Sequence, residues 1–147
     1  MKTEFKFKGI HSCEAVVLSC IDFRFWKETM EFVETELGIT SYDFPSLPGG
    51  AKPINECASD DDLAMKCIGV PCDLHHVKKI VIVNHEDCGA YGGSKKFQSA
   101  EEELDFHTEE LKRAKEKLAE KYPDLDIITV FARLADGGYN IEFLTIS

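Results

Sequence analysis

A histidine and a cysteine, His85 and Cys88, stand three positions apart just beyond the β-branched run KKIVIV. A third residue of the same kind, Cys20, ends another short apolar run, EAVVLSC. Imidazole nitrogen and thiolate sulfur are the ligand types that zinc prefers in proteins. Two thiolates and one imidazole form a recognised catalytic zinc set, which leaves a fourth position open for water or a substrate. The pattern favours one Zn²⁺ per chain, held by Cys20, His85 and Cys88.

Two charged residues, Asp22 and Arg24, alternate with Cys20 along the chain. By itself each feature has an ordinary explanation: a His-x-x-Cys pair arises by chance, a cysteine ending a strand is usually a small core residue, and an Asp–Arg pair can be a surface ion pair worth under about 1 kcal/mol. All five residues at the ends of two predicted strands are harder to explain by chance. Their combination favours a functional site.

Apolar periodicity predicts the elements that would position these residues. Strands are expected over 14–20, 42–47, 77–84, 126–133 and 139–146, and helices over 25–37, 55–69 and 100–121. This alternation predicts an α/β fold: a mostly parallel sheet of about four strands plus an antiparallel C-terminal edge strand, with helices on both faces. Sites in such sheets form beyond the carboxyl ends of the strands. If the first and third strands are neighbours, the three zinc ligands can meet there.

The composition narrows the classes of function. The chain of 147 residues matches one domain, 1–147. A net charge of −10 argues against nucleic acid and against anionic membrane surfaces as partners. No apolar run is long enough to span a membrane, and the N-terminus lacks the apolar core of a signal peptide. We therefore expect a cytoplasmic location, where the six cysteines stay reduced.

The segments 20-CIDFR-24 and 85-HEDCG-89 resemble the two hallmarks of the β-class carbonic anhydrases, C-x-D-x-R and H-x-x-C-G. The resemblance implies zinc held by Cys20, His85 and Cys88, and a catalytic dyad in which Arg24 keeps Asp22 ionised. It implies reversible hydration of CO₂ to bicarbonate, with zinc-bound hydroxide as the nucleophile. It also implies a homodimer or higher homo-oligomer. In some family members the aspartate itself ligates zinc in a closed, inactive state.

The sequence departs from the family around this site. The segment 46-SLPGG-50 keeps two glycines but lacks the usual arginine and asparagine, and Ile21 and Phe23 replace the serines that commonly flank the aspartate. These changes predict a more apolar substrate pocket, although aromatic residues at strand ends more often pack in the core. The expected pocket residues are Ile21, Phe23, Phe44, Gly49, Gly50, Gly89 and Tyr91.

Other functions remain open at this point. An apolar pocket would suit carbon disulfide or carbonyl sulfide as well as CO₂, and the altered loop is compatible with a non-catalytic zinc-binding protein on the same scaffold. A redox pair such as Cys67 and Cys72 lacks the C-x-x-C spacing, and no role is assigned to Cys13 or Cys57. The adjacent histidines 75 and 76 point in different directions, so we expect ordinary surface or core residues rather than a metal-binding pair.

Overall fold

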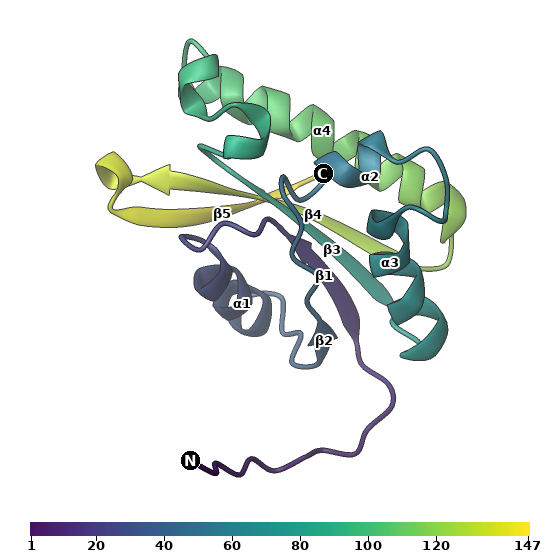
Figure 1. Cartoon of the computed structure of the whole chain (residues 1–147). Helices are drawn as coiled ribbons and strands as arrows, with labels where there is room; N and C mark the ends of the chain where they lie inside the picture. Colours follow the sequence, from purple (N-terminus) through teal and green to yellow (C-terminus); the bar gives the residue numbers. More distant parts are fainter.

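Five strands form one sheet in the order β2-β1-β3-β4-β5 (Figure 1). The structure is a computed structural model that describes all residues 1–147. The first four strands are parallel and β5 pairs antiparallel with β4, so the predicted fold class is confirmed. The strand bounds are β1 Ala15–Ser19, β2 Tyr42–Asp43, β3 Lys79–His85, β4 Asp126–Ala135 and β5 Asn140–Ile146.

Helices cover both faces of this sheet, as predicted. Helix α1 (Trp26–Thr35) lies on one face, and α2 (Lys52–Glu56), α3 (Leu63–Leu74) and α4 (Ala100–Lys121) lie on the other (Figure 1). Strand β1 shows the alternation that produces this arrangement, because successive side chains point to opposite faces. Val16 and Leu18 pack in the core beneath α3 and α4, whereas Ala15 and Val17 pack with Val33 of α1.

The two central strands bring the predicted ligands to one edge of the sheet. Both β1 and β3 are buried along almost their whole length, which explains their continuous apolar sequences. They are parallel neighbours, with Ser19 opposite Val83. Because Cys20 follows β1 and His85 ends β3, the two side chains leave the sheet at the same carboxyl edge. The expectation that the first and third strands are neighbours is confirmed.

The single helix expected over 55–69 is wrong. Helix α2 ends at Glu56, and α3 begins at Leu63 and continues through Pro71 to Leu74. Between them the Asp62 carboxylate accepts a hydrogen bond of 2.6 Å from the backbone N–H of Ala58. This side chain satisfies a backbone donor outside helical geometry and so closes a turn, as Asp commonly does. The other two predicted helices are present, and α4 has the predicted bounds.

Two further features concern the N-terminal segment and the character of the helices. Residues 1–13 form no helix or strand, and Figure 1 shows this segment running away from the sheet. None of the helices has both the length and the apolar character needed to cross a membrane.

Candidate metal centre

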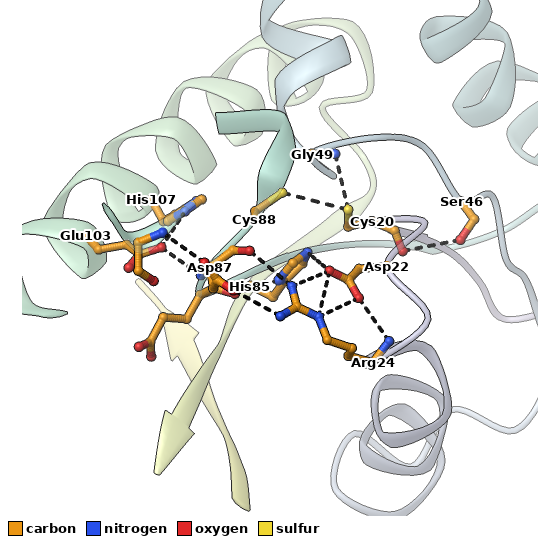
Figure 2. Close-up of polar contacts among 12 residues, drawn as sticks. Cys20, Asp22, Arg24, Ser46, Gly49, His85, Asp87, Cys88, Glu103 and His107 are labelled. Carbon is orange, nitrogen blue, oxygen red and sulfur yellow. Dashed lines mark hydrogen bonds and ion pairs between the residues drawn. The ribbon is translucent and has the colours of Figure 1, made fainter. Parts of the chain in front are cut away.

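Three donor atoms converge at the carboxyl edge of the sheet (Figure 2). The sulfur atoms of Cys20 and Cys88 are 3.8 Å apart, and these two atoms and a ring nitrogen of His85 all lie within 4.8 Å of one another. All three side chains are buried. Tetrahedral zinc with bonds of about 2.0–2.3 Å would space its ligand atoms roughly 3.3–3.8 Å apart. The cluster is therefore close to the size that zinc requires.

The orientation of His85 leaves one ring nitrogen free for a metal. Nδ1 lies 2.7 Å from the carbonyl oxygen of Glu86, which can only accept, so Nδ1 carries the proton. Nε2 is buried and has no hydrogen-bond partner. The ring of Phe25 stacks on the imidazole with the centroids 4.2 Å apart and fixes its plane. An unpaired buried acceptor is costly, and metal-ligating histidines typically donate their other N–H to a carbonyl in this way. The residues present fit zinc.

The glycine-rich loop after β2 supports Cys20. The backbone N–H of Gly49 donates to Cys20 Sγ at 3.3 Å. Gly50 has φ +58°, and a Cβ atom there would lie 2.4 Å from the carbonyl oxygen of Val83. Glycine is therefore needed for the loop to approach β3 so closely. The contact between the two sulfur atoms lowers the pKa of Cys20 and raises the pKa of Cys88. One sulfur of the pair thus favours the thiolate form that a metal binds.

Asp22 and Arg24 form an ion pair beside these donors. Arg24 Nη2 and Nε donate to the Asp22 carboxylate at 2.6 and 2.9 Å, and Nη1 donates to Asp87 Oδ2 at 2.9 Å (Figure 2). The hydrogen bonds from Arg24 lower the pKa of Asp22 to about 2. Asp22 Oδ2 lies 3.8 Å from His85 Nε2. An ionised carboxylate therefore faces the nitrogen that is available for a metal.

The hollow beside the centre has a polar lining. Its volume is about 610 Å³, and it is lined by Asp22, Arg24, Asp87, Gly89, Gly92, Gly93 and Lys95. Of the expected pocket residues, only Gly89 lines it.

The other expected pocket residues lie elsewhere or contribute through the backbone. Ile21 and Phe23 are 57% and 82% exposed in the turn after β1. Phe44 packs on the core beneath α1. Tyr91 is buried, with its hydroxyl 3.4 Å from a carboxylate oxygen of Glu110. Gly49 and Gly50 shape the loop through their backbone. The structure does not gather an apolar pocket from these side chains, because packing or the course of the turn takes each away from the hollow.

Comparison with known proteins identifies the family. A family model described as "Putative carbonic anhydrase" matches residues 10–142. The chain belongs to this family. Its curated relatives include two uncharacterized proteins. One, from Rickettsia bellii (strain RML369-C), is 31% identical over 128 residues, covering 83% of this chain and 77% of the relative. The other, from Rickettsia conorii (strain ATCC VR-613 / Malish 7), is 30% identical over 128 residues, covering 83% and 68%.

Two solved structures share the fold. The β-carbonic anhydrase isoform I of Trichomonas vaginalis has a TM-score of 0.61 at 18% identity, covering 98% of this chain and 87% of that one. The β-carbonic anhydrase of the fungal pathogen Aspergillus fumigatus has a TM-score of 0.53 at 17% identity, covering 91% and 76%. The family match and these structures confirm the resemblance to β-carbonic anhydrases, and the low identities mark a divergent member.

A buried polar chain behind the centre was not predicted from the sequence. Asn84 Oδ1 accepts from the backbone N–H of Ala51 at 2.8 Å, so its amide nitrogen donates to His107 Nδ1 at 3.1 Å. The remaining proton of neutral His107 is then on Nε2, which lies 3.9 Å from Glu103 Oε1, too far for a hydrogen bond, and has no other partner. That same oxygen accepts from the backbone N–H of Asp87 at 2.8 Å. Asn84 and His107 thus contact the loop after β2, and Glu103 beside them contacts the loop after β3, the two loops that carry metal-site contacts.

A sequence signal for this chain does exist. The buried residues of α4 form one stripe: Glu103, His107, Leu111, Ala114 and Leu118. Two polar residues therefore occupy the first positions of an otherwise apolar stripe. Buried polar groups require partners, so this pattern points to a polar contact beneath the helix. Burial lowers the pKa of His107 to about 4, which keeps its ring neutral near pH 7.

Proposed function

We propose that this chain is a zinc-dependent carbonic anhydrase that reversibly hydrates CO₂ to bicarbonate. The observation that carries the proposal is the convergence of Cys20, Cys88 and the unpaired Nε2 of His85 beside the ionised carboxylate of Asp22. Membership of the carbonic anhydrase family and the shared fold support an activity of this type.

Each residue of the candidate centre has a role in the proposed reaction. Cys20, His85 and Cys88 would hold one zinc ion. When bound, zinc supplies the Lewis acid that makes hydroxide available near neutral pH for attack on CO₂. Asp22, ionised and adjacent to His85 Nε2, would accept a hydrogen bond from the attacking water and orient it. Arg24 binds Asp22 and Asp87 together and so fixes the position of that carboxylate.

The lining of the hollow suits bicarbonate, the anion of the proposed reaction. It contains Arg24 and Lys95 and no apolar side chain. Arg24 is occupied by two carboxylates, whereas Lys95 makes no ion pair. A free ammonium group at the mouth suits an anionic product such as bicarbonate.

Assembly and location complete the proposal. We propose that residues 1–147 act as one zinc domain in a homodimer or larger homo-oligomer in the cytoplasm. Light scattering after size-exclusion chromatography measures the number of copies, and fractionation of the source cells measures the location.

Stopped-flow CO₂ hydration by zinc-loaded protein, from neutral to alkaline pH, tests the function. The Cys88→Ser variant is the control, with carbon disulfide and carbonyl sulfide assayed on the same preparation. The proposal expects hydration well above background that is lost in the variant. Zinc-loaded protein that is inert toward CO₂ but consumes a sulfur substrate would replace it with the hydrolase function. Inertness toward all three would indicate a non-catalytic zinc protein.

A further inference from the structure

We propose that Cys13, Asp43 and His75 form a second metal site, suited to Zn²⁺ or a similar divalent cation, at the opposite end of the sheet. Cys13 precedes β1 and Cys20 follows it. At about 3.3 Å per residue, the seven steps along the chain from Cys13 to Cys20 place the two sites roughly 23 Å apart. The second site is therefore separate from the candidate metal centre and does not depend on the proposed function.

The donor atoms already lie within reach of one ion. A sulfur of Cys13, a carboxylate oxygen of Asp43 and a ring nitrogen of His75 all lie within 4.8 Å of one another. Asp43 Oδ2 is 2.6 Å from His75 Nδ1 and 3.8 Å from Cys13 Sγ. Thiolate, imidazole and carboxylate are all accepted zinc ligands. Replacing the shared proton between Asp43 and His75 by a cation requires these two groups to separate by only about 1 Å, to the ligand spacing of tetrahedral zinc.

Main-chain hydrogen bonds fix the three residues relative to one another. The backbone N–H of Cys13 donates to the carbonyl oxygen of His75 at 3.1 Å. His75 itself caps α3 through a bond of 3.0 Å to the carbonyl oxygen of Pro71. Asp43 lies in β2, opposite Val16 of β1. Three different segments therefore present their ligands from an ordered backbone. Binding of an ion then costs the protein little conformational entropy.

A hollow gives a cation access to this cluster. Its volume is about 430 Å³, and Cys13, Asp43 and His75 line it together with His11 and Ser41. The side chains of His75 and Asp43 are 42% and 33% exposed, so water can reach the ligand atoms. The site can therefore bind an ion from solution while a water molecule fills a fourth coordination position.

The cluster also explains the adjacent histidines. His76 has a left-handed backbone conformation, with φ +54°, and turns the chain from α3 toward β3. The expectation that His75 and His76 do not form a pair is consistent with this turn. His75 instead meets residues that are 32 and 62 positions away in the sequence, which no local pattern could reveal.

Without a metal, the same contacts would be an ordinary Asp43–His75 ion pair beside a thiol, worth little at this exposure. Metal counting distinguishes the two. The protein is dialysed against a buffer that holds free Zn²⁺ at about micromolar concentration, at which protein zinc sites fill. The number of zinc ions per chain is then measured by mass spectrometry. We expect two zinc ions in the wild type, one in His75→Ala and one in Cys88→Ser.

The matched control is His76→Ala, which removes the neighbouring histidine and should retain two zinc ions. Cys13→Ser provides a second variant of the cluster, and circular dichroism verifies the fold of each protein. Hydration of CO₂ by His75→Ala should stay within twofold of the wild type, which separates this site from the catalytic one. The same number of zinc ions in the wild type as in folded His75→Ala and Cys13→Ser would overturn the proposal whatever the hydration activity.

Discussion

The carboxylate of Asp22 faces the unpaired ring nitrogen of His85, with Oδ2 and Nε2 3.8 Å apart. Arg24 holds the carboxylate in this position, and the carbonyl oxygen of Glu86 fixes the tautomer of the histidine. The ligand and the neighbouring acceptor are thus oriented by separate hydrogen bonds. Such pre-orientation is what a catalytic metal centre requires of the groups around it.

Replacing Asp22 by asparagine should slow hydration without loss of zinc. The amide keeps the shape of the side chain but removes the charge that would orient the attacking water. A positioned acid–base group typically contributes at least about 100-fold, so we expect kcat/KM for CO₂ to fall by about that factor. Stopped-flow assays at equal zinc content measure it. Asp87→Asn, which alters the other carboxylate on Arg24, should have a smaller effect, and equal rates in wild type and Asp22→Asn would remove Asp22 from the mechanism.

Hydration should become faster as the pH rises. Two of the three donors are thiolates, whose negative charge offsets that of the metal and so weakens the acidification of water relative to three neutral imidazoles. We expect the rate to increase from about pH 6.5 into the alkaline range. Stopped-flow profiles at constant ionic strength provide the measurement. A profile already flat above that pH would show that the donor set does not control the ionisation.

His107 should make the protein less stable in acid. Its folded-state pKa is about 4, below the value near 6.5 of an unfolded histidine. Between these values the unfolded chain binds the extra proton and the folded chain does not, so stability is complete above about pH 6.5 and falls as the pH decreases toward 4. The linked loss is on the order of 3 kcal/mol.

Urea unfolding of wild type and His107→Gln at pH 7, 5 and 4 tests this linkage. Glutamine retains an acceptor for Asn84 but does not titrate, so the variant should lose less stability on acidification than the wild type. The metal ligands are the same in both proteins, so acid release of zinc affects both curves. Parallel curves would assign the acid sensitivity to groups other than His107.

Gly50→Ala should destabilise the protein more than Gly38→Ala. Both glycines have positive φ, but a Cβ atom at Gly50 would lie 2.4 Å from the carbonyl oxygen of Val83, whereas one at Gly38 meets nothing within 4 Å. The left-handed conformation alone costs about 1–2 kcal/mol for an alanine. Urea unfolding should show that cost for Gly38→Ala and a clearly larger one for Gly50→Ala, and equal losses would mean that the loop can move away from β3.

Some of this architecture could be predicted from local sequence. The apolar runs before Cys20 and His85 predict buried parallel strands, and parallel strands end at the same edge of a sheet. The apolar stripe and the Ser99 cap give α4 its bounds, with Ser99 Oγ accepting from the N–H of Glu102. In these cases periodicity and capping act over a few residues, so the sequence contains the information.

Other features depend on contacts between distant residues. The stripe of α4 marks Glu103 and His107 as buried, but their partners, the backbone of Asp87 and the side chain of Asn84, lie outside the helix. The turn that separates α2 from α3 depends on where the Asp62 side chain points. The direction of Phe44 is decided by packing beneath α1. Cys13 and His75 come together only through the pairing of strands and the course of α3. None of these contacts leaves a periodic pattern.

X-ray absorption at the zinc edge tests the central claim most directly. The sample is the His75→Ala variant loaded with one zinc ion per chain, so that the candidate centre alone contributes. The account predicts two sulfur ligands, one imidazole nitrogen and one further light atom, and it predicts that adding Cys88→Ser to this variant removes the bound zinc. A zinc ion without sulfur ligands, or zinc that stays bound with the same spectrum after Cys88→Ser is added, would contradict the metal centre assigned to Cys20, His85 and Cys88.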